Sequence, residues 1–207
     1  MVTQLDSAVP DLPVEWTGIW SDVAKELRRY RADGMAHLVT EDVVRFATIQ
    51  VLARSHVNPA ILRVEYPHPV IRHSKIDLTV GLPPSNVIEF KYPREPNEKN
   101  AAWTMTLGEI LKDFYRLAII EGQVRRQVIL VTTGRLRRFL ESSAKRHYLV
   151  MSPERVELVP DTIAALPASA SSILTSLYSH HVMATGTTYA IDDDLRLTAY
   201  LVAASIE

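Results

Sequence analysis

The stretch that decides the fold is SKIDLTVGLPPSNVIEFKY, residues 74–92. It reads as two β-rich runs joined by a turn of Gly, Pro and Ser, which is typical of a β-hairpin. If Val80 faces Asn86 across that turn, the pairing continues down both strands. Asp77 then lies directly opposite Glu89.

Alternation along the two strands separates an apolar face from a charged face. The apolar face, which we expect to be core, carries Ile76, Leu78, Val80, Ile88, Phe90 and Tyr92. The other face carries Lys75, Asp77, Glu89 and Lys91. Opposed Cβ atoms lie about 5 Å apart, so Asp77 and Glu89 repel each other unless a cation lies between them. Mg²⁺ is usually held by one or two carboxylates with water and phosphate oxygens, so this pair suits Mg²⁺ or Mn²⁺.

Lys91 follows Glu89 by two residues, beside the expected ion. Its ammonium could orient or deprotonate an attacking water, or neutralise charge in a phosphoryl transition state. A second interpretation is a solvated hairpin, on which Lys75 pairs diagonally with Glu89 and Lys91 pairs with Asp77. Spacing alone leaves both interpretations open.

The rest of the chain predicts α/β or α+β architecture around a mixed sheet. Before residue 147 we expect helices at 17–31, 43–55, 106–122 and 135–146, with strands at 61–66 and 128–132. Beyond it we expect short strands at 148–151 and 156–159, a helix at 170–184 and a hairpin at 187–204. Thr40 is the expected N-cap of the second helix, and Thr106 opens a capping box for the third.

Asp77 is followed, after eleven residues, by Glu89-Phe90-Lys91, and each of these two elements ends an apolar strand. This pattern resembles the signature of the PD-(D/E)XK nucleases. The order of helix, three-strand meander, helix and strand is also similar to this restriction-endonuclease-like superfamily. The resemblance covers roughly residues 38–133. It departs at Ile76, which stands where the superfamily name has proline.

The resemblance implies a restriction-endonuclease-like core and a metal-dependent hydrolysis of phosphodiester bonds, with DNA as the expected partner. Asp77, Glu89 and Lys91 are the implied catalytic residues, and Asp77 and Glu89 the implied Mg²⁺ or Mn²⁺ ligands. The backbone carbonyl of Phe90 would be a further ligand. The alternative is a catalytically inactive relative that binds nucleic acid or protein.

Two helices are expected to add residues to this site. In several branches, including archaeal Holliday-junction resolvases, a glutamate on the first core helix joins the metal site. Glu41 occupies the matching place and lies in line with Val44 and Thr48, hence facing inward. Lys112, on the polar side of the following helix, is a candidate supporting residue, although such a face is often merely solvated.

Residues 125–146 contain seven Arg and Lys against Glu141 alone, a local excess of six positive charges in a chain of net charge −1. Arg135, Arg137 and Arg138 are therefore candidate phosphate contacts. A basic helix face with no ligand explains the same pattern.

The remaining composition mainly excludes classes of functional site. With no Cys, thiolate zinc sites and cysteine nucleophiles are ruled out, and no phosphate-binding or dinucleotide glycine motif is present. Adjacent His180 and His181 point about 100° apart on a helix, and residues 192–194 are expected to be a turn. No apolar run is long enough to span a bilayer and no secretory signal is visible, so we expect a soluble cytoplasmic protein.

We expect one folding unit of 207 residues in three parts. These parts are an N-terminal arm and helix (1–37), the nuclease-like core (38–150) and a C-terminal extension of the same domain (151–207). The extension would either enlarge the sheet or form a dimer surface. A homodimer is a possible partner state, because two copies related by a twofold axis could cut both strands of a duplex.

Overall fold

The computed structural model describes residues 14–93, 100–174 and 180–204. The first part of the chain forms α1 (Trp16–Ala32), α2 (Glu41–Arg54), β1 (Leu62–Pro67), β2 (Lys75–Val80), β3 (Asn86–Lys91), α3 (Asn100–Ala118) and β4 (Arg125–Thr132). The second part forms α4 (Gly134–Arg146), β5 (Val150–Met151), β6 (Arg155–Leu158), α5 (Pro160–Ala164), α6 (Ala168–Leu174), β7 (Val182–Ala190) and β8 (Arg196–Val202). Short 3₁₀ turns lie at Ala36–Leu38 and Pro59–Ile61.

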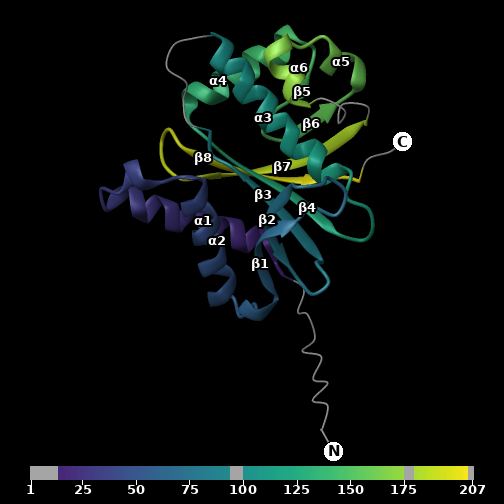
Figure 1. The fold of residues 1–207 in the computed structure, drawn as a ribbon. Coiled ribbons are helices and arrows are strands. Elements are labelled where there is room, and N and C mark those ends of the chain that lie inside the picture. The colour runs from purple at the N-terminus through teal and green to yellow at the C-terminus, as the bar shows by residue number, and fades with distance from the viewer. Residues whose placement is uncertain (1–13, 94–99, 175–179, 205–207) are drawn as a thin grey trace, which may run out of the picture.

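All strands of the described residues belong to one mixed sheet, in the order β1-β2-β3-β4-β8-β7-β6-β5 (Figure 1). β1, β2 and β3 form an antiparallel meander, and β4 lies parallel to β3 because α3 carries the chain back across the sheet. β8 then pairs antiparallel with β4. The predicted α/β class is therefore confirmed, and the C-terminal region enlarges the sheet.

The two faces of the sheet bury separate cores. α1 and α2 cover one face, over Leu78 and Phe90, whereas α3 to α6 cover the other, over Val87 and Val128 (Figure 1). The face predicted to be charged is thus covered as well. Ile76 was expected beside Leu78 but packs with the α3 core, because the pairing of β2 is interrupted between these two residues.

Local sequence signals explain the elements around the hairpin. Thr40 caps α2, and its Oγ1 accepts a hydrogen bond from Val43 N at 3.4 Å. Val80 pairs with Asn86 as predicted. Gly81 permits this turn, since its φ of 101° suits glycine and an added Cβ would lie 2.7 Å from the side chain of Ser85.

Two predicted helices have different limits in the structure. α3 begins at Asn100, so Thr106 lies inside the helix and does not cap it. The helix expected at 170–184 is present only as α6, and β7 begins at Val182. Residues 182–184 are strand because they pair with β6, a contact with a distant segment that the local sequence does not reveal. Residues 175–179 of that predicted helix lie outside the described residues.

A buried hydrogen bond fastens α1 to the sheet, and it predicts a difference between two tryptophans. Trp20 Nε1 donates to Gln127 Oε1 at 2.9 Å, and both residues are buried. Trp16, stacked on Trp20, makes no such bond among the described residues. Trp20→Phe should therefore lower the unfolding free energy by about 1–3 kcal/mol more than the control Trp16→Phe, because it strands the buried Gln127 amide. Urea denaturation of both variants measures this, and equal losses would contradict it.

Candidate active site

β2 has no ladder partner at Asp77 on either side. Toward β1 the pairing skips Glu65, whose backbone is left-handed with a φ of 52°. Toward β3 the ladder ends at Leu78. The Asp77 side chain replaces the missing backbone bond, since its Oδ2 accepts from Phe90 N at 2.8 Å. The sheet thus opens at the position where Asp77 was predicted to face Glu89.

Glu89 points from β3 into the layer between the sheet and α3 and is only 2% exposed. Its Oε1 lies 3.0 Å from Arg116 Nη2, yet that oxygen has no aligned hydrogen bond among the described residues. Burial raises the pKa of Glu89 well above its ordinary value, and the charges of Asp113 and Asp77 raise it further against the pull of Arg116. A carboxylate in this position needs more positive charge than one guanidinium supplies.

α3 places Asp113 and Arg116, one turn apart, over the end of β3. Lys91 Nζ lies 3.1 Å from Asp113 Oδ2, and Arg116 Nη1 lies 3.4 Å from Asp113 Oδ1. Burial raises the pKa of Asp113 to about 6, although Lys91 and Arg116 favour its charged form. Burial lowers the pKa of Lys91, but Asp113 and then Glu41 more than offset this and raise it to about 12. Lys91 is therefore an ammonium at neutral pH, and Asp113 is the carboxylate that holds it.

Glu41 reaches the same place from the first turn of α2. Its Oε2 accepts a hydrogen bond of 3.3 Å from the backbone amide that follows Lys91, and it lies 3.8 Å from Lys91 Nζ. Burial raises the pKa of Glu41, whereas the charge of Lys91 lowers it. With 40% of its side chain exposed, Glu41 stands where the buried groups meet solvent.

Arg45, one turn further along α2, connects β1 to β2. Its Nη1 lies 2.9 Å from Glu65 Oε1 and 3.6 Å from Asp77 Oδ1. Arg45 also pairs with Asp42, and Glu65 pairs with Lys75 at 3.4 Å. Glu65 thus has a left-handed backbone and a carboxylate that pairs with two cations, Arg45 and Lys75.

These contacts form one group, which we call the carboxylate cluster. It contains Glu41, Asp42, Glu65, Asp77, Glu89 and Asp113 with Arg45, Lys75, Lys91 and Arg116. Ion pairs divide it into a half around Arg45 and a half around Arg116, each with three carboxylates and two cations. Fully ionised, each half carries one net negative charge, and the halves meet where Asp77 contacts Glu89.

The structure therefore brings together Glu41, Asp77, Glu89 and Lys91, as the sequence predicted. The solvated-hairpin interpretation is wrong, because Glu89 is buried. The pairs that it expected are also replaced, since Lys75 pairs with Glu65, and Lys91 with Asp113 and Glu41.

Four residues of the cluster that touch this site were not predicted: Arg45, Glu65, Asp113 and Arg116. Lys112, predicted to support the site, makes no ion pair with the cluster among the described residues, whereas its neighbour Asp113 does. Helical spacing could have shown this, because Asp113 follows the buried Ile110 by three residues and precedes the buried Leu117 by four. Arg45 could have been found in the same way, because it follows Glu41 by four residues on one helix. Glu65 carried no such signal, since its neighbours Arg63 and Val64 are exposed.

The basic segment 125–146 is not one surface. Arg126 is buried and its guanidinium donates to the carbonyls of Ile120, Gly122 and Val124. Arg137 donates to the carbonyls of Thr132 and Asp194, and Arg135 lies 5.2 Å from the ring of Trp103. Of the three predicted phosphate contacts, Arg138 is exposed without an ion pair among the described residues.

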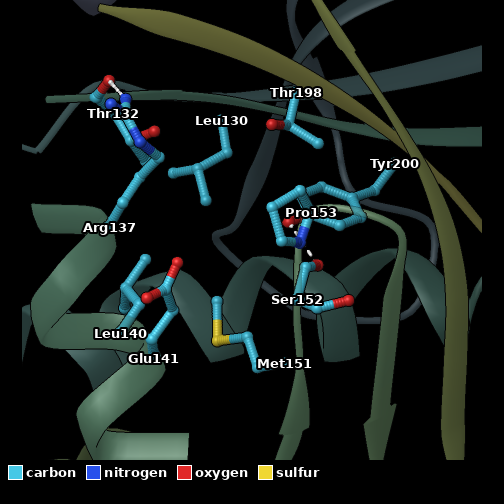
Figure 2. A pocket seen from close by; sticks show the side chains of 10 residues that line it. All are labelled: Leu130, Thr132, Arg137, Leu140, Glu141, Met151, Ser152, Pro153, Thr198 and Tyr200. Carbon is cyan, nitrogen blue, oxygen red and sulfur yellow. Dashed lines mark hydrogen bonds between the residues drawn. The ribbon is translucent and has the colours of Figure 1, made fainter. Parts of the chain in front are cut away.

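A small cavity lies on the α3–α6 side of the sheet, against α4 (Figure 2). Arg137 turns toward Thr132 at its rim, and Tyr200 donates to the carbonyl of Ser152 at 2.9 Å (Figure 2). Its volume of about 30 Å³ holds a few water molecules. The cavity offers no room for a nucleotide.

Comparison with known proteins finds no match to any protein family, to any curated protein or to any solved structure. Among the described residues, no three or more His, Asp or Glu side chains converge as a complete metal-ligand set. None of the described helices is long and apolar enough to cross a membrane.

The buried carboxylates predict how stability depends on pH. Because the pKa of Asp113 rises to about 6 on folding, the folded state binds more protons than the unfolded chain between its ordinary value of 3.8 and about 6. This group's contribution to stability is complete below pH 3.8 and is lost as pH rises through about 6. Asp113→Asn should therefore reduce the decline in unfolding free energy across this range, measured by urea denaturation without divalent cations. Asp193→Asn, at an exposed aspartate without an ion pair among the described residues, should keep the wild-type profile. A wild-type profile for Asp113→Asn would contradict the argument.

Proposed function

We propose that the protein is a divalent-metal-dependent nuclease of the PD-(D/E)XK type, acting on DNA. The order α2-β1-β2-β3-α3-β4, with an antiparallel meander and a parallel fourth strand, supports this reading. So does the location of Asp77 and Glu89-Phe90-Lys91 at the opened ends of β2 and β3. The observation that carries the proposal is the contact of two carboxyl groups, Asp77 and Glu89, inside a cluster of six carboxyl groups and only four cations.

The donor set fits one divalent cation. Fully ionised, the cluster has a net charge of −2, which equals the charge that such an ion would neutralise, and Asp77 and Glu89 are the hard oxygen ligands that Mg²⁺ and Mn²⁺ accept. The raised pKa of Glu89 favours its protonated form, and a bound cation would favour the ionised form. Glu89 Oε1 and Asp113 Oδ2 are buried oxygens without an aligned hydrogen bond among the described residues. Two carboxylates with waters and substrate oxygens suffice for Mg²⁺, so a set of three is not required. Glu41 would join through water.

The chain's own residues then have distinct roles. A bound divalent ion would supply an activated water and stabilise charge on the phosphodiester oxygens. Lys91, held as an ammonium by Asp113, would stabilise negative charge and orient water, and its pKa of about 12 makes it unsuited to accept a proton at neutral pH. Asp113 positions Lys91 at 3.1 Å and takes no part in the chemistry itself.

The catalytic role of Lys91 is tested against the nearby lysine on α3. Lys91→Ala should lower the cleavage rate of DNA by two orders of magnitude or more, because the lost charge acts mainly on the transition state. Lys112→Ala, at a lysine outside the cluster, should cleave as the wild type does. Cleavage of labelled duplex and single-stranded DNA with Mg²⁺, Mn²⁺ or EDTA measures both variants. Loss of less than twofold in Lys91→Ala would remove this residue from the mechanism.

A second candidate is a nuclease-like module that binds without hydrolysis. It is favoured by the arginines, because Arg116 already lies 3.0 Å from Glu89 and Arg45 lies 3.6 Å from Asp77. In such a protein the two guanidinium groups would take the place of the metal ion.

Thermal melting separates the two candidates without any substrate. A metal that binds only the folded protein stabilises it by about 2.7 kcal/mol at a hundred times the dissociation constant, so Mn²⁺ should raise the Tm of the wild type. Asp77→Asn relieves the repulsion with Glu89, so this variant should melt no lower than wild type in EDTA and should gain much less from Mn²⁺. Asp193→Asn should respond to Mn²⁺ as the wild type does. Indifference of the wild type to millimolar Mn²⁺ would favour the non-hydrolytic module.

A further inference from the structure

The turn 68–74, between β1 and β2, is held in one conformation by a buried histidine. His68 Nδ1 accepts hydrogen bonds from Val70 N at 3.1 Å and Ile71 N at 3.0 Å. Its Nε2 lies 2.8 Å from the carbonyl of Arg116, so Nε2 carries the hydrogen and the ring is neutral. Burial lowers the pKa of His68, which favours this neutral form. The backbone amide of His68 also donates to the carbonyl of Ser74 at 2.9 Å, which closes the turn.

The same helix residue joins this turn to the carboxylate cluster. Arg116 accepts from His68 through its carbonyl, and its guanidinium donates to the carbonyl of Lys75 and pairs with Glu89. The turn therefore lies directly beside the place where Asp77 contacts Glu89. Its position is coupled to that of Glu89 by one side chain.

The turn is the cationic edge of an otherwise acidic site. From residue 66 to residue 76 the chain has no Asp or Glu but carries Arg72 and Lys75. Arg72 is exposed and has no ion pair among the described residues. Lys75 pairs with Glu65 at 3.4 Å, but 60% of its side chain is exposed.

A phosphodiester needs such an edge to approach the cluster. With its carboxyl groups ionised, the cluster has a net negative charge and repels phosphate. Its own arginines and Lys91 are mostly buried and occupied by carboxylates, whereas Lys75 keeps most of its side chain exposed beside Glu65. Affinity for a phosphate backbone must therefore come from cations outside these pairs.

From this we infer that the turn 68–74, with Arg72 and the adjoining Lys75, is the surface that binds the nucleic-acid backbone beside the carboxylate cluster. The inference rests on the proposed nuclease function for the identity of the ligand. We prefer the turn to α4 as the principal phosphate contact, because Arg116 joins the turn to the carboxylate cluster, whereas Arg137 on α4 is bonded to backbone carbonyls and Arg138 makes no ion pair with the cluster among the described residues. His68 joins the turn to α3 through its hydrogen bonds to Val70, Ile71 and Arg116.

Binding measured without cleavage tests the inference. Fluorescence anisotropy of the full chain with a labelled 20-nucleotide single strand and the matching duplex, in EDTA, gives the dissociation constant over a series of salt concentrations. Each phosphate contact adds about 0.9 to the slope of log K against log salt for duplex DNA. Arg72→Glu should weaken binding several-fold and reduce this slope by about 0.9 or more. Arg72→Lys, which keeps the charge, should retain the wild-type slope.

Arg138→Glu on α4 is the matched control, since it reverses an equally exposed arginine. It should leave the slope unchanged. An unchanged slope in Arg72→Glu, a flattened slope in Arg138→Glu alone, or no binding by the wild type would each overturn the inference.

Failure of this inference and failure of the nuclease proposal give different results. If cleavage requires Lys91 but the salt slope of Arg72→Glu is unchanged, the nuclease proposal stands and the turn is not the binding surface. If the salt slope of Arg72→Glu is reduced but the wild type cleaves no substrate, the turn remains the binding surface and the nuclease proposal is rejected.

Discussion

The burial of the Glu89 carboxylate is the constraint on which the rest of the site depends. A charged group at 2% exposure is costly unless opposite charge lies against it, so the fold must bring cations to that point of the sheet. Arg116 comes from α3, and Lys91 comes from the same strand as Glu89. Asp113 then holds both cations. The position of α3 over β3 is therefore fixed by electrostatics as well as by apolar packing.

The opening of the sheet at Asp77 has the same origin. If β2 and β3 stayed paired to their ends, two carboxylates would face each other with no cation between them. The ladder stops at Leu78, and the Asp77 side chain accepts a hydrogen bond from the backbone amide of Phe90. Hydrogen bonding is thus conserved while the strands separate.

The two arginines give the site two possible states of charge balance. In the structure Arg116 and Arg45 partly compensate Glu89 and Asp77, and full ionisation of the cluster would leave two negative charges without a partner. A divalent ion would complete the balance and would compete with Arg116 for Glu89. Arg116 also bonds to His68 and Lys75 at the β1–β2 turn. Its displacement would therefore change the hydrogen bonds at that turn. The proposed metal site and the proposed substrate surface are therefore connected through the contacts of Arg116.

The sequence by itself determined the hairpin register from Val80 opposite Asn86 to Leu78 opposite Ile88 and the Thr40 cap, because strand alternation and helix capping are local and act over a few residues. It did not determine that the ladder ends there, so that Asp77 meets Glu89 through side chains and not as a paired position. It did not determine that β7 replaces the end of a predicted helix, since a strand forms there only when β6 and β8 lie beside it. Nor did it determine which Arg and Lys side chains are exposed and which are bonded to other parts of the chain. Arg126 and Arg137 look like exposed cations in the sequence, but backbone carbonyls from other elements bind them. Asp113 and Arg116 join the site only because α3 packs across β3, and such contacts between distant residues exist only in the folded structure.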